Sequence, residues 1–289
     1  MKHLAKSDLA DWTIAKILFL FALSAISGLA LIALFIVHEG FPVIVSQGAA
    51  GFLLSTDWNP DKGSFGILAM IAGSAAVTFG ALVLGVPLGL ASAIALTEFC
   101  PGGPARFLKA LIELLAGIPS VVYGFMGLVL LVPLIRDHLG GGGMSVLAAS
   151  IVLGIMILPN VVSISMDAMR AVPQSFREGS IALGATKWQT VHRVVLRAAR
   201  SGIVTAIILG MGRAVGETMA VIMVAGNSIV IPHNLTDPVR TLTSNVALEM
   251  GYASGKHQQA LFATGIVLFV MIMILNSIAT WASSRRSWK

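Results

Sequence analysis

The sequence predicts an all-α integral membrane protein, a bundle of six membrane-spanning helices. Of its 289 residues, 56% are apolar and only 11% are charged, and the mean hydropathy is +0.90. A soluble globular domain carries about twice that share of charged residues. A bilayer core is crossed by roughly 20 consecutive apolar residues. Six runs reach that length, at residues 14–37, 65–97, 114–135, 139–166, 201–231 and 258–284.

Lysine and arginine set the orientation of these spans, because positively charged flanks resist translocation. Of the 19 such residues, fourteen fall in segments that a cytoplasmic N-terminus would place inside, four fall outside, and Arg213 lies within a span. Both termini and the loop 170–200 are therefore predicted to be cytoplasmic. Residues 1–64 would form a tail, the first span and an outside loop. Residues 65–284 would form a core of five spans, and residues 285–289 a cytoplasmic tail.

Several function classes are excluded by the sequence. No basic run is interleaved with aromatic residues, so we expect no nucleic-acid partner. No nucleotide-binding P-loop and no Cys/His metal spacing occur, so we expect no ATPase site, metal or other cofactor in this chain. The single cysteine, Cys100, forms no internal disulfide. The lipid bilayer is the partner that composition indicates, and a membrane enzyme would lack a recognisable nucleophile.

Before the second span, Asp57-Trp58-Asn59-Pro60 and then Phe65-Gly66 indicate a turn within an outside loop of residues 38–64. Trp58 has a second interpretation, because tryptophan also anchors proteins at the membrane interface. We leave the two interpretations open at this point.

A proline interrupts the third span. Residues 117–124 read Gly-Ile-Pro-Ser-Val-Val-Tyr-Gly, with Pro119 after a glycine. A proline there breaks the helix and frees backbone groups that must be buried in protein or face water. Such a break is expected equally at a transport site and at a packing kink. Pro119, Ser120 and, in the fourth span, Ser163 are therefore candidates for lining a pathway.

The fifth span contains the most costly side chains, Arg213 and Glu217. A central arginine costs about 2.5–3.5 kcal/mol on insertion scales, so such residues face a cavity, a partner or each other. Their spacing of four predicts that they share one helical face. One interpretation is an ion pair that holds two helices together. It does not explain Gly210, Gly212 and Gly216, which remove bulk and leave room beside the pair.

A second interpretation is an anion site. A guanidinium presents a rigid fork that suits an oxyanion. Glu217 would accept a hydrogen bond from a protonated oxyanion such as HPO₄²⁻ and repel a fully ionised one such as sulfate. Our hypothesis is that Arg213 contacts the passing anion and Glu217 balances it. A proton-coupled secondary transporter, in which Glu217 holds the proton, is a third possibility.

Residues 170–200 predict two short helices joined by a tight corner. Pro173 suits the first helical position, and Gly184 suits a left-handed C-terminal cap. Thr186 and Gln189 form a capping box that starts the second helix. A connection of this length and regularity is more often functional than a mere link.

This loop resembles the EAA loop of ABC-importer permeases through Glu178-Gly179-Ser180, Gly184 and the later Val194-Val195-Leu196. The resemblance implies that Glu178, Gly179, Ser180 and Gly184 couple the chain to a cytoplasmic ATPase. Gly179 and Ser180 stand where the family has alanines, and Arg197 stands where it has proline. Residues 117–124 and 210–221 are similar to the PstC-type permeases of phosphate-specific ABC importers.

The resemblance implies the MetI-like, six-span architecture of a type I ABC importer permease in the bacterial cytoplasmic (inner) membrane. It implies alternating access driven by ATP and Mg²⁺ in two cytoplasmic ATPase partners, with a second, PstA-type permease alongside. A periplasmic or lipid-anchored phosphate-binding protein would deliver the substrate. The outside loop from Gly226 to His257, which contains the polar set Thr241, Thr243, Ser244 and Asn245, is expected to help receive it. Only the resemblance selects phosphate over phosphonate, molybdate or sulfate.

Overall fold

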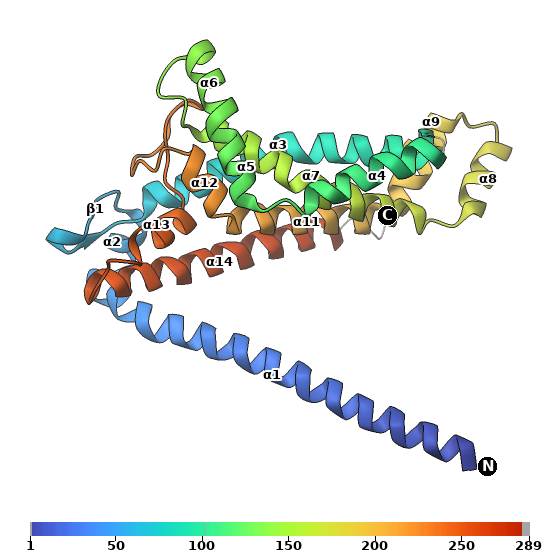
Figure 1. Ribbon diagram of the computed structural model, residues 1–289, viewed down its shortest axis with the longest axis horizontal. Coiled ribbons are helices and arrows are strands. Elements are labelled where there is room, and N and C mark those ends of the chain that lie inside the picture. Colours follow the sequence, from blue (N-terminus) through green and yellow to red (C-terminus); the bar gives the residue numbers. More distant parts are fainter. Residues whose placement is uncertain (1, 101, 285–289) are drawn as a thin grey trace.

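The computed structural model describes residues 2–100 and 102–284, which are mostly helical (Figure 1). Five helices are long and apolar enough to cross a membrane: Trp12–Gln47, Leu68–Phe99, Ser120–Leu139, Val146–Arg170 and Lys256–Trp281. Lys187–Ala198 and Arg200–Gly216 meet the same test only together, as a pair bent by 70°, and the described residues contain six crossings if this pair counts as one. The predicted all-α bundle is confirmed, and its fifth crossing is not one continuous helix.

The helices and strands follow one another along the chain with these bounds: α1 Lys2–Gln47, α2 Ala49–Leu54, β1 Trp58–Asn59, β2 Ser64–Phe65, α3 Leu68–Ile94, α4 Gly102–Ala116, α5 Ser120–Met126, α6 Val132–Leu139, α7 Val146–Arg170, α8 Gln174–Ala182, α9 Lys187–Thr190, α10 Leu196–Ala198, α11 Arg200–Gly216, α12 Met219–Val224, α13 Leu242–Glu249 and α14 Lys256–Ser284. Three π-helical turns extend α3, α5 and α9, at Ala95–Phe99, Gly127–Leu131 and Val191–Val195. The third span therefore begins at Ser120, after the break at Gly117–Pro119, and the fourth begins at Val146.

The core is the packing of α3 and α11 on α7, which is the most enclosed of these spans. Glycine lets the α3 and α7 backbones approach closely, since a Cβ at Gly85 would lie 2.7 Å from the Gly154 carbonyl oxygen. In lipid, where burial of apolar surface gives no driving force between helices, such close contacts of small residues supply the packing. Helix α7 is thereby fixed against α3.

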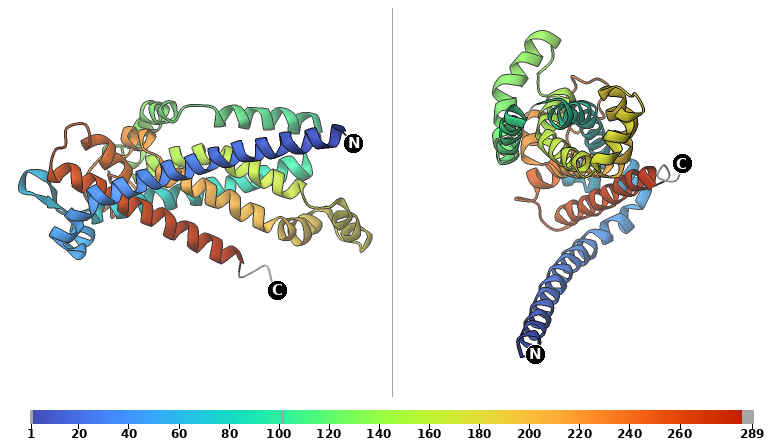
Figure 2. Two further views of the ribbon diagram at one scale, coloured as in Figure 1. Left: turned by 90° about the horizontal axis from the view of Figure 1, so that it is seen from below. Right: turned by 90° about the vertical axis from the view of Figure 1, so that its right-hand side faces the viewer.

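Helix α1 joins the bundle near one of its ends and diverges from α14 toward its N-terminus (Figures 1 and 2). At the junction Gly40 packs on the backbone of Ala263, and the rings of Phe35 and Phe262 meet edge to face at 5.5 Å. The apolar run predicts a first span that ends at residue 37, but the helix continues to Gln47. It continues because packing against α14 and its neighbours buries residues on this last stretch, such as Val43.

The two ends of the bundle differ in what they contain. The start of α1, the end of α14 and the α8–α9 hairpin lie at one end, and β1, β2 and α13 lie at the other (Figures 1 and 2). The start of α1 and the end of α14 thus lie at the same end of the bundle, as six crossings predict.

The predicted turn before the second span is confirmed. Strands β1 and β2 pair antiparallel, with Trp58 opposite Phe65, and Gly63 closes the turn with φ of +70°. Trp58 is only 7% exposed and donates from Nε1 to Glu249 Oε2 at 2.9 Å. Its interpretation as a membrane-interface anchor is therefore wrong, because the indole is buried inside the protein.

Glu249 of α13 is the centre of a buried polar cluster at this end. Besides Trp58, its carboxylate meets Arg240 Nη1 at 2.6 Å and His257 Nε2 at 2.8 Å. Arg240 also donates to Asn245 Oδ1 at 3.1 Å. A buried carboxylate is tolerated where several donors satisfy it. The cluster ties the β-hairpin, α13 and the start of α14 together.

We predict that Gly40→Ala lowers the melting temperature of the purified protein. A Cβ there would lie 2.5 Å from the Ala263 backbone nitrogen, and overpacking of this kind costs about 1–3 kcal/mol. Gly28→Ala is the matched control, since a Cβ at that position on α1 meets no atom within 4 Å. Equal melting temperatures for the two variants in detergent would contradict the close α1–α14 contact.

Candidate functional site

The predicted fifth span, residues 201–231, is interrupted at Glu217. Helix α11 ends at Gly216, Glu217 has an extended backbone (φ −69°, ψ 132°), and α12 begins at Met219. Arg213 and Glu217 therefore do not share a helical face, and that prediction is wrong. The spacing rule assumed a continuous helix, whereas the chain turns directly after a glycine.

The freed polar groups at this break are satisfied by the protein. The Glu217 carboxylate accepts from the backbone N–H of Ala220 at 3.2 Å, in the first turn of α12. Thr243 of α13 donates its hydroxyl to the Glu217 carbonyl at 3.0 Å. Unpaired backbone groups are not tolerated at membrane depth, so these two bonds allow the interruption to exist.

Arg213 lies half-buried in the last turn of α11. Its Nη1 donates to Asn160 Oδ1 of α7 at 3.5 Å, a long hydrogen bond. Within residues 2–100 and 102–284 no ion pair joins Arg213 to Glu217, so the interpretation as a self-contained ion pair is wrong. Sequence reasoning does not identify Asn160 as a site residue; its one signal in the sequence is a polar side chain directly after Pro159.

The three glycines around the pair serve different purposes. A Cβ at Gly210 would lie 3.3 Å from Val161, so this glycine lets α11 pack on α7. Gly212 and Gly216 have no atom within 4 Å of their Cβ positions. Two of the three glycines thus border open space beside Arg213 and Glu217.

The break in the third span lies close to the same region. Pro119 is the N-cap of α5, Ser120 is its first residue, and Gly124 packs against Ala220 at the start of α12. Tyr123 donates its hydroxyl to the Leu115 carbonyl at 2.8 Å, which bridges the break.

The serine predicted in the fourth span lies on α7. Ser163 is half-buried and stands three residues after Asn160, the residue that contacts Arg213. A pathway along Pro119, Ser120 and Ser163 stays a prediction.

The hairpin after α7 has the predicted form. Gly184 adopts φ of +84° at the end of α8. Thr186 Oγ1 accepts from Gln189 N at 3.3 Å, and Gln189 Oε1 accepts from Thr186 N at 2.9 Å, so the capping box is confirmed. Ser180 and Thr190 join the two arms through their hydroxyls at 3.0 Å. Pro173 is the N-cap of α8, one position before the predicted one.

The hairpin presents large apolar side chains at the end of the bundle. Leu183 at the corner is 91% exposed, and exposed neighbours include Phe176, Ile181 and Trp188. Glu178, Gly179 and Gly184 are also exposed, and Ser180 is half-buried. A hollow of about 360 Å³ lies on this face, lined in part by Phe176 and Leu183. Exposed apolar surface with a polar surround is typical of a protein-binding site.

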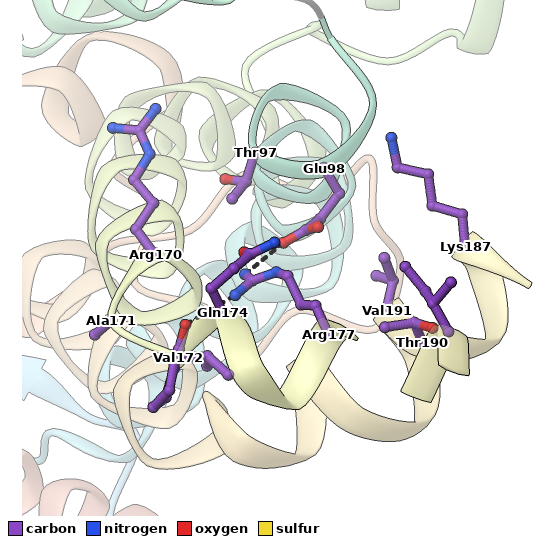
Figure 3. A pocket seen from close by; sticks show the side chains of 12 residues that line it. Thr97, Glu98, Arg170, Ala171, Val172, Gln174, Arg177, Lys187, Thr190 and Val191 are labelled. Carbon is purple, nitrogen blue, oxygen red and sulfur yellow. Dashed lines mark hydrogen bonds and ion pairs between the residues drawn. The ribbon is translucent and has the colours of Figure 1, made fainter. Parts of the chain in front are cut away.

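A larger cavity of about 670 Å³ lies between the hairpin and the end of the second span (Figure 3). Its charged lining residues are Glu98, Arg170, Arg177 and Lys187. Arg177 and Glu98 form an ion pair across it at 2.9 Å.

The polar set of the outside segment lies inside the protein. Thr241, Thr243, Ser244 and Asn245 are all buried. Thr241 caps α13 by accepting from the Ser244 N–H, and Thr243 is bonded to Glu217. These four residues therefore hold α13 inside the bundle, and the expectation that the loop from Gly226 to His257 helps to receive a binding protein stays a prediction.

A helical bundle with interrupted spans and a protruding helical hairpin is the architecture of a membrane permease. Residues 85–288 match the family described as "Binding-protein-dependent transport system inner membrane component", and the chain belongs to this family. It is thus a multi-pass membrane permease subunit of bacterial ABC transporters, a family whose members are not themselves enzymes.

Curated relatives agree with this assignment. The chain is 44% identical to the probable ABC transporter permease protein YqgH of Bacillus subtilis, over 92% of this chain and 88% of that one. It is 36% identical to the phosphate transport system permease protein PstC of Pasteurella multocida, over 79% and 78%. It is also 36% identical to the protein of the same name from Haemophilus influenzae, over 90% and 89%.

Solved structures share the fold. The chain resembles the MetNI methionine ABC transporter in an inward-facing form, with a TM-score of 0.60 and 20% identity over 76% of this chain and 94% of that one. It also resembles a bacterial ABC transporter that imports alginate, with a TM-score of 0.58 and 14% identity over 76% and 79%. The predicted MetI-like architecture is confirmed.

We predict that Gly184→Ala loosens the hairpin, because an L side chain at φ of +84° is strained by about 1–2 kcal/mol. Gly179→Ala is the control, since it lies inside α8 and neither Cβ position has an atom within 4 Å. Hydrogen–deuterium exchange over residues 174–198 should accelerate in the first variant only. Equal exchange in both would contradict a strain-based role for Gly184.

Proposed function

We propose that this chain is a permease subunit of an ATP-driven importer of inorganic phosphate. The observation on which the proposal rests is the guanidinium of Arg213 beside a broken span, with open space at Gly212 and Gly216. Relatives named as phosphate transport permeases support the choice of phosphate.

Arg213 contacts the passing anion. Its bond to Asn160 is long, so an oxyanion with stronger acceptors displaces Asn160 at little cost. Glu217, at the break, accepts a hydrogen bond from a protonated phosphate and repels sulfate, which has no proton to donate. Because the break frees Glu217 from the helix, its carboxylate can turn from Ala220 N to the anion without unwinding α11.

The hairpin couples this site to ATP hydrolysis. Two cytoplasmic ATPase subunits bind ATP and Mg²⁺, and one of them receives α8 through Glu178, Gly179, Ser180 and the corner at Gly184. A second, PstA-type permease completes the membrane part, and a periplasmic or lipid-anchored phosphate-binding protein delivers the substrate. Closure of the ATPase pair displaces the hairpin and alternates the access of the anion site.

In this assembly the hairpin and both termini face the cytoplasm. The excess of lysine and arginine in the segments on that side supports the orientation. The end with β1, β2 and α13 then faces the binding protein.

The function is tested by labelled phosphate uptake in phosphate-starved cells with and without this chain. We expect uptake to require the chain and ATP, and unlabelled sulfate or molybdate not to compete. If cells without the chain lose uptake of another oxyanion and keep phosphate uptake, the chain is still an importer permease, but its substrate is that other anion. Arrest by an uncoupler without ATP depletion would indicate a proton-coupled carrier and contradict the proposal.

We predict that Arg213→Gln lowers phosphate transport about tenfold or more, the equivalent of one charged hydrogen bond, while the ATPases still co-purify. Glu217→Gln should make sulfate a competitor, because the repulsion is removed. Thr205→Ala is the control on α11, since its hydroxyl donates to Ser201 O within the same helix. Unchanged transport and selectivity in correctly assembled Arg213 and Glu217 variants would make the pair structural.

We predict that Leu183→Asp abolishes co-purification of the ATPase subunits, because a charge replaces the most exposed apolar side chain of the docking corner. Leu235→Asp is the control, a leucine 63% exposed in the segment between α12 and α13. Pull-down from detergent-solubilised membranes measures both. Retention of the ATPases by Leu183→Asp would place the docking surface elsewhere.

A further inference from the structure

Arg177 of α8 makes three bonds to the parts of the chain that precede it. Its Nη1 donates to the Val172 carbonyl at 2.8 Å. Its Nη2 donates to the Met169 carbonyl and to Glu98 Oε1, both at 2.9 Å. The side chains of Arg177 and Glu98 are 15% and 9% exposed, and Figure 3 shows them meeting between the hairpin and the end of the second span.

One of these bonds caps the end of the fourth span, and another holds the segment that follows it. Helix α7 ends at Arg170, and the last carbonyls of a helix have no partner within it. Arg177 donates to the carbonyl of Met169, in the last turn of α7, and to that of Val172, two residues beyond the helix, and it places a positive charge at the negative end of the helix dipole. The coupling helix α8 therefore caps the span that precedes it.

The third bond reaches the second span. Glu98 lies in the π-helical turn Ala95–Phe99 that ends α3. One rigid guanidinium thus joins α8 to the ends of both α3 and α7, and a lysine cannot reproduce this arrangement with its single ammonium. Removal of either partner would leave a largely buried charge uncompensated.

Positive charge alone does not make this link. Arg170 and Lys187 line the same cavity, yet the structure places neither in an ion pair with Glu98. The Lys187 ammonium lies instead over the Phe99 ring, 5.1 Å from its centroid. The position of Arg177 on α8, rather than the charge of the hairpin, determines the contact.

We propose that Arg177 is a positioning residue that makes the hairpin move as one rigid body with α3 and α7. The route continues from α7 to the anion site, because Asn160 of α7 contacts Arg213. A displacement of α8 by the ATPase is then delivered to the site rather than dissipated by bending at Val172–Pro173. This inference rests on the proposed coupling function and assigns the residue that transmits the motion.

The test is the number of phosphate ions transported per ATP hydrolysed by the assembled complex in proteoliposomes with its binding protein. The variants are Arg177→Gln, Glu98→Gln and the double variant. Glu113→Gln is the matched control, because it makes the same change in an exposed ion pair with Lys109. We expect each single variant to keep ATP hydrolysis and to lower the transport ratio at least about threefold, with the double variant no worse than Arg177→Gln.

If Arg177→Gln and Glu98→Gln both keep the wild-type ratio of phosphate transported to ATP hydrolysed, the inference is overturned and the proposed function still stands. The same holds if each single variant lowers the ratio and the two reductions add fully in the double variant, because the two side chains would then act independently. Should Arg177→Gln not assemble, Glu98→Gln alone decides, since it keeps the size and polarity of the side chain. A wild-type complex that hydrolyses ATP and moves no phosphate would overturn the proposed function, and the inference with it. A loss in Glu113→Gln equal to that in Glu98→Gln would also count against a specific role for Arg177.

Discussion

The structure depends on the pairing of backbone polar groups at one interrupted helix. In a bilayer an unpaired carbonyl or N–H costs several kcal/mol, so a break must be covered by protein. At Glu217 the cover comes from Thr243 of α13 and from the Glu217 carboxylate itself, which takes the Ala220 N–H. Because these bonds satisfy the break, Arg213 and Glu217 lie beside it without forming an ion pair with each other.

The rest of the bundle supports that break from both ends. Helix α13 is fixed by the buried Glu249 carboxylate, which Trp58, Arg240 and His257 all contact. On the other side, α7 places Asn160 against Arg213 and is capped at its end by Arg177 of α8. A motion at either end of the molecule therefore has a contiguous path of packed and hydrogen-bonded groups to the same site, which is the arrangement that alternating access requires.

Much of this could be predicted from the sequence, because the relevant signals are local. Long apolar runs, the Gly184 cap and the Thr186–Gln189 capping box depend on neighbouring residues, and the structure contains all of them. The prediction of a helical face shared by Arg213 and Glu217 is wrong because a single Gly-Glu-Thr step ends the helix. No local rule separates such a step from an ordinary glycine inside a span.

The contacts of the site could not be predicted, since they join distant segments. Asn160 reaches Arg213 across 53 residues, and the Arg177–Glu98 pair spans 79. The sequence around Trp58 suits lipid and protein equally, and only its partner Glu249, 191 residues away, decides between them. Charge and apolarity identify the residues that cost free energy to place within a membrane span, whereas tertiary packing determines which residues they contact.

The central claim is that Arg213 holds the anion at the break in the fifth crossing. It is tested most directly by a cryo-electron microscopy structure of the assembled complex in lipid, trapped with phosphate during turnover. The account predicts anion density within hydrogen-bonding distance of the Arg213 guanidinium, about 2.7–3.2 Å, and an Arg213 side chain that is no longer bonded to Asn160. Phosphate bound elsewhere in the membrane part, with Arg213 still against Asn160, would contradict it.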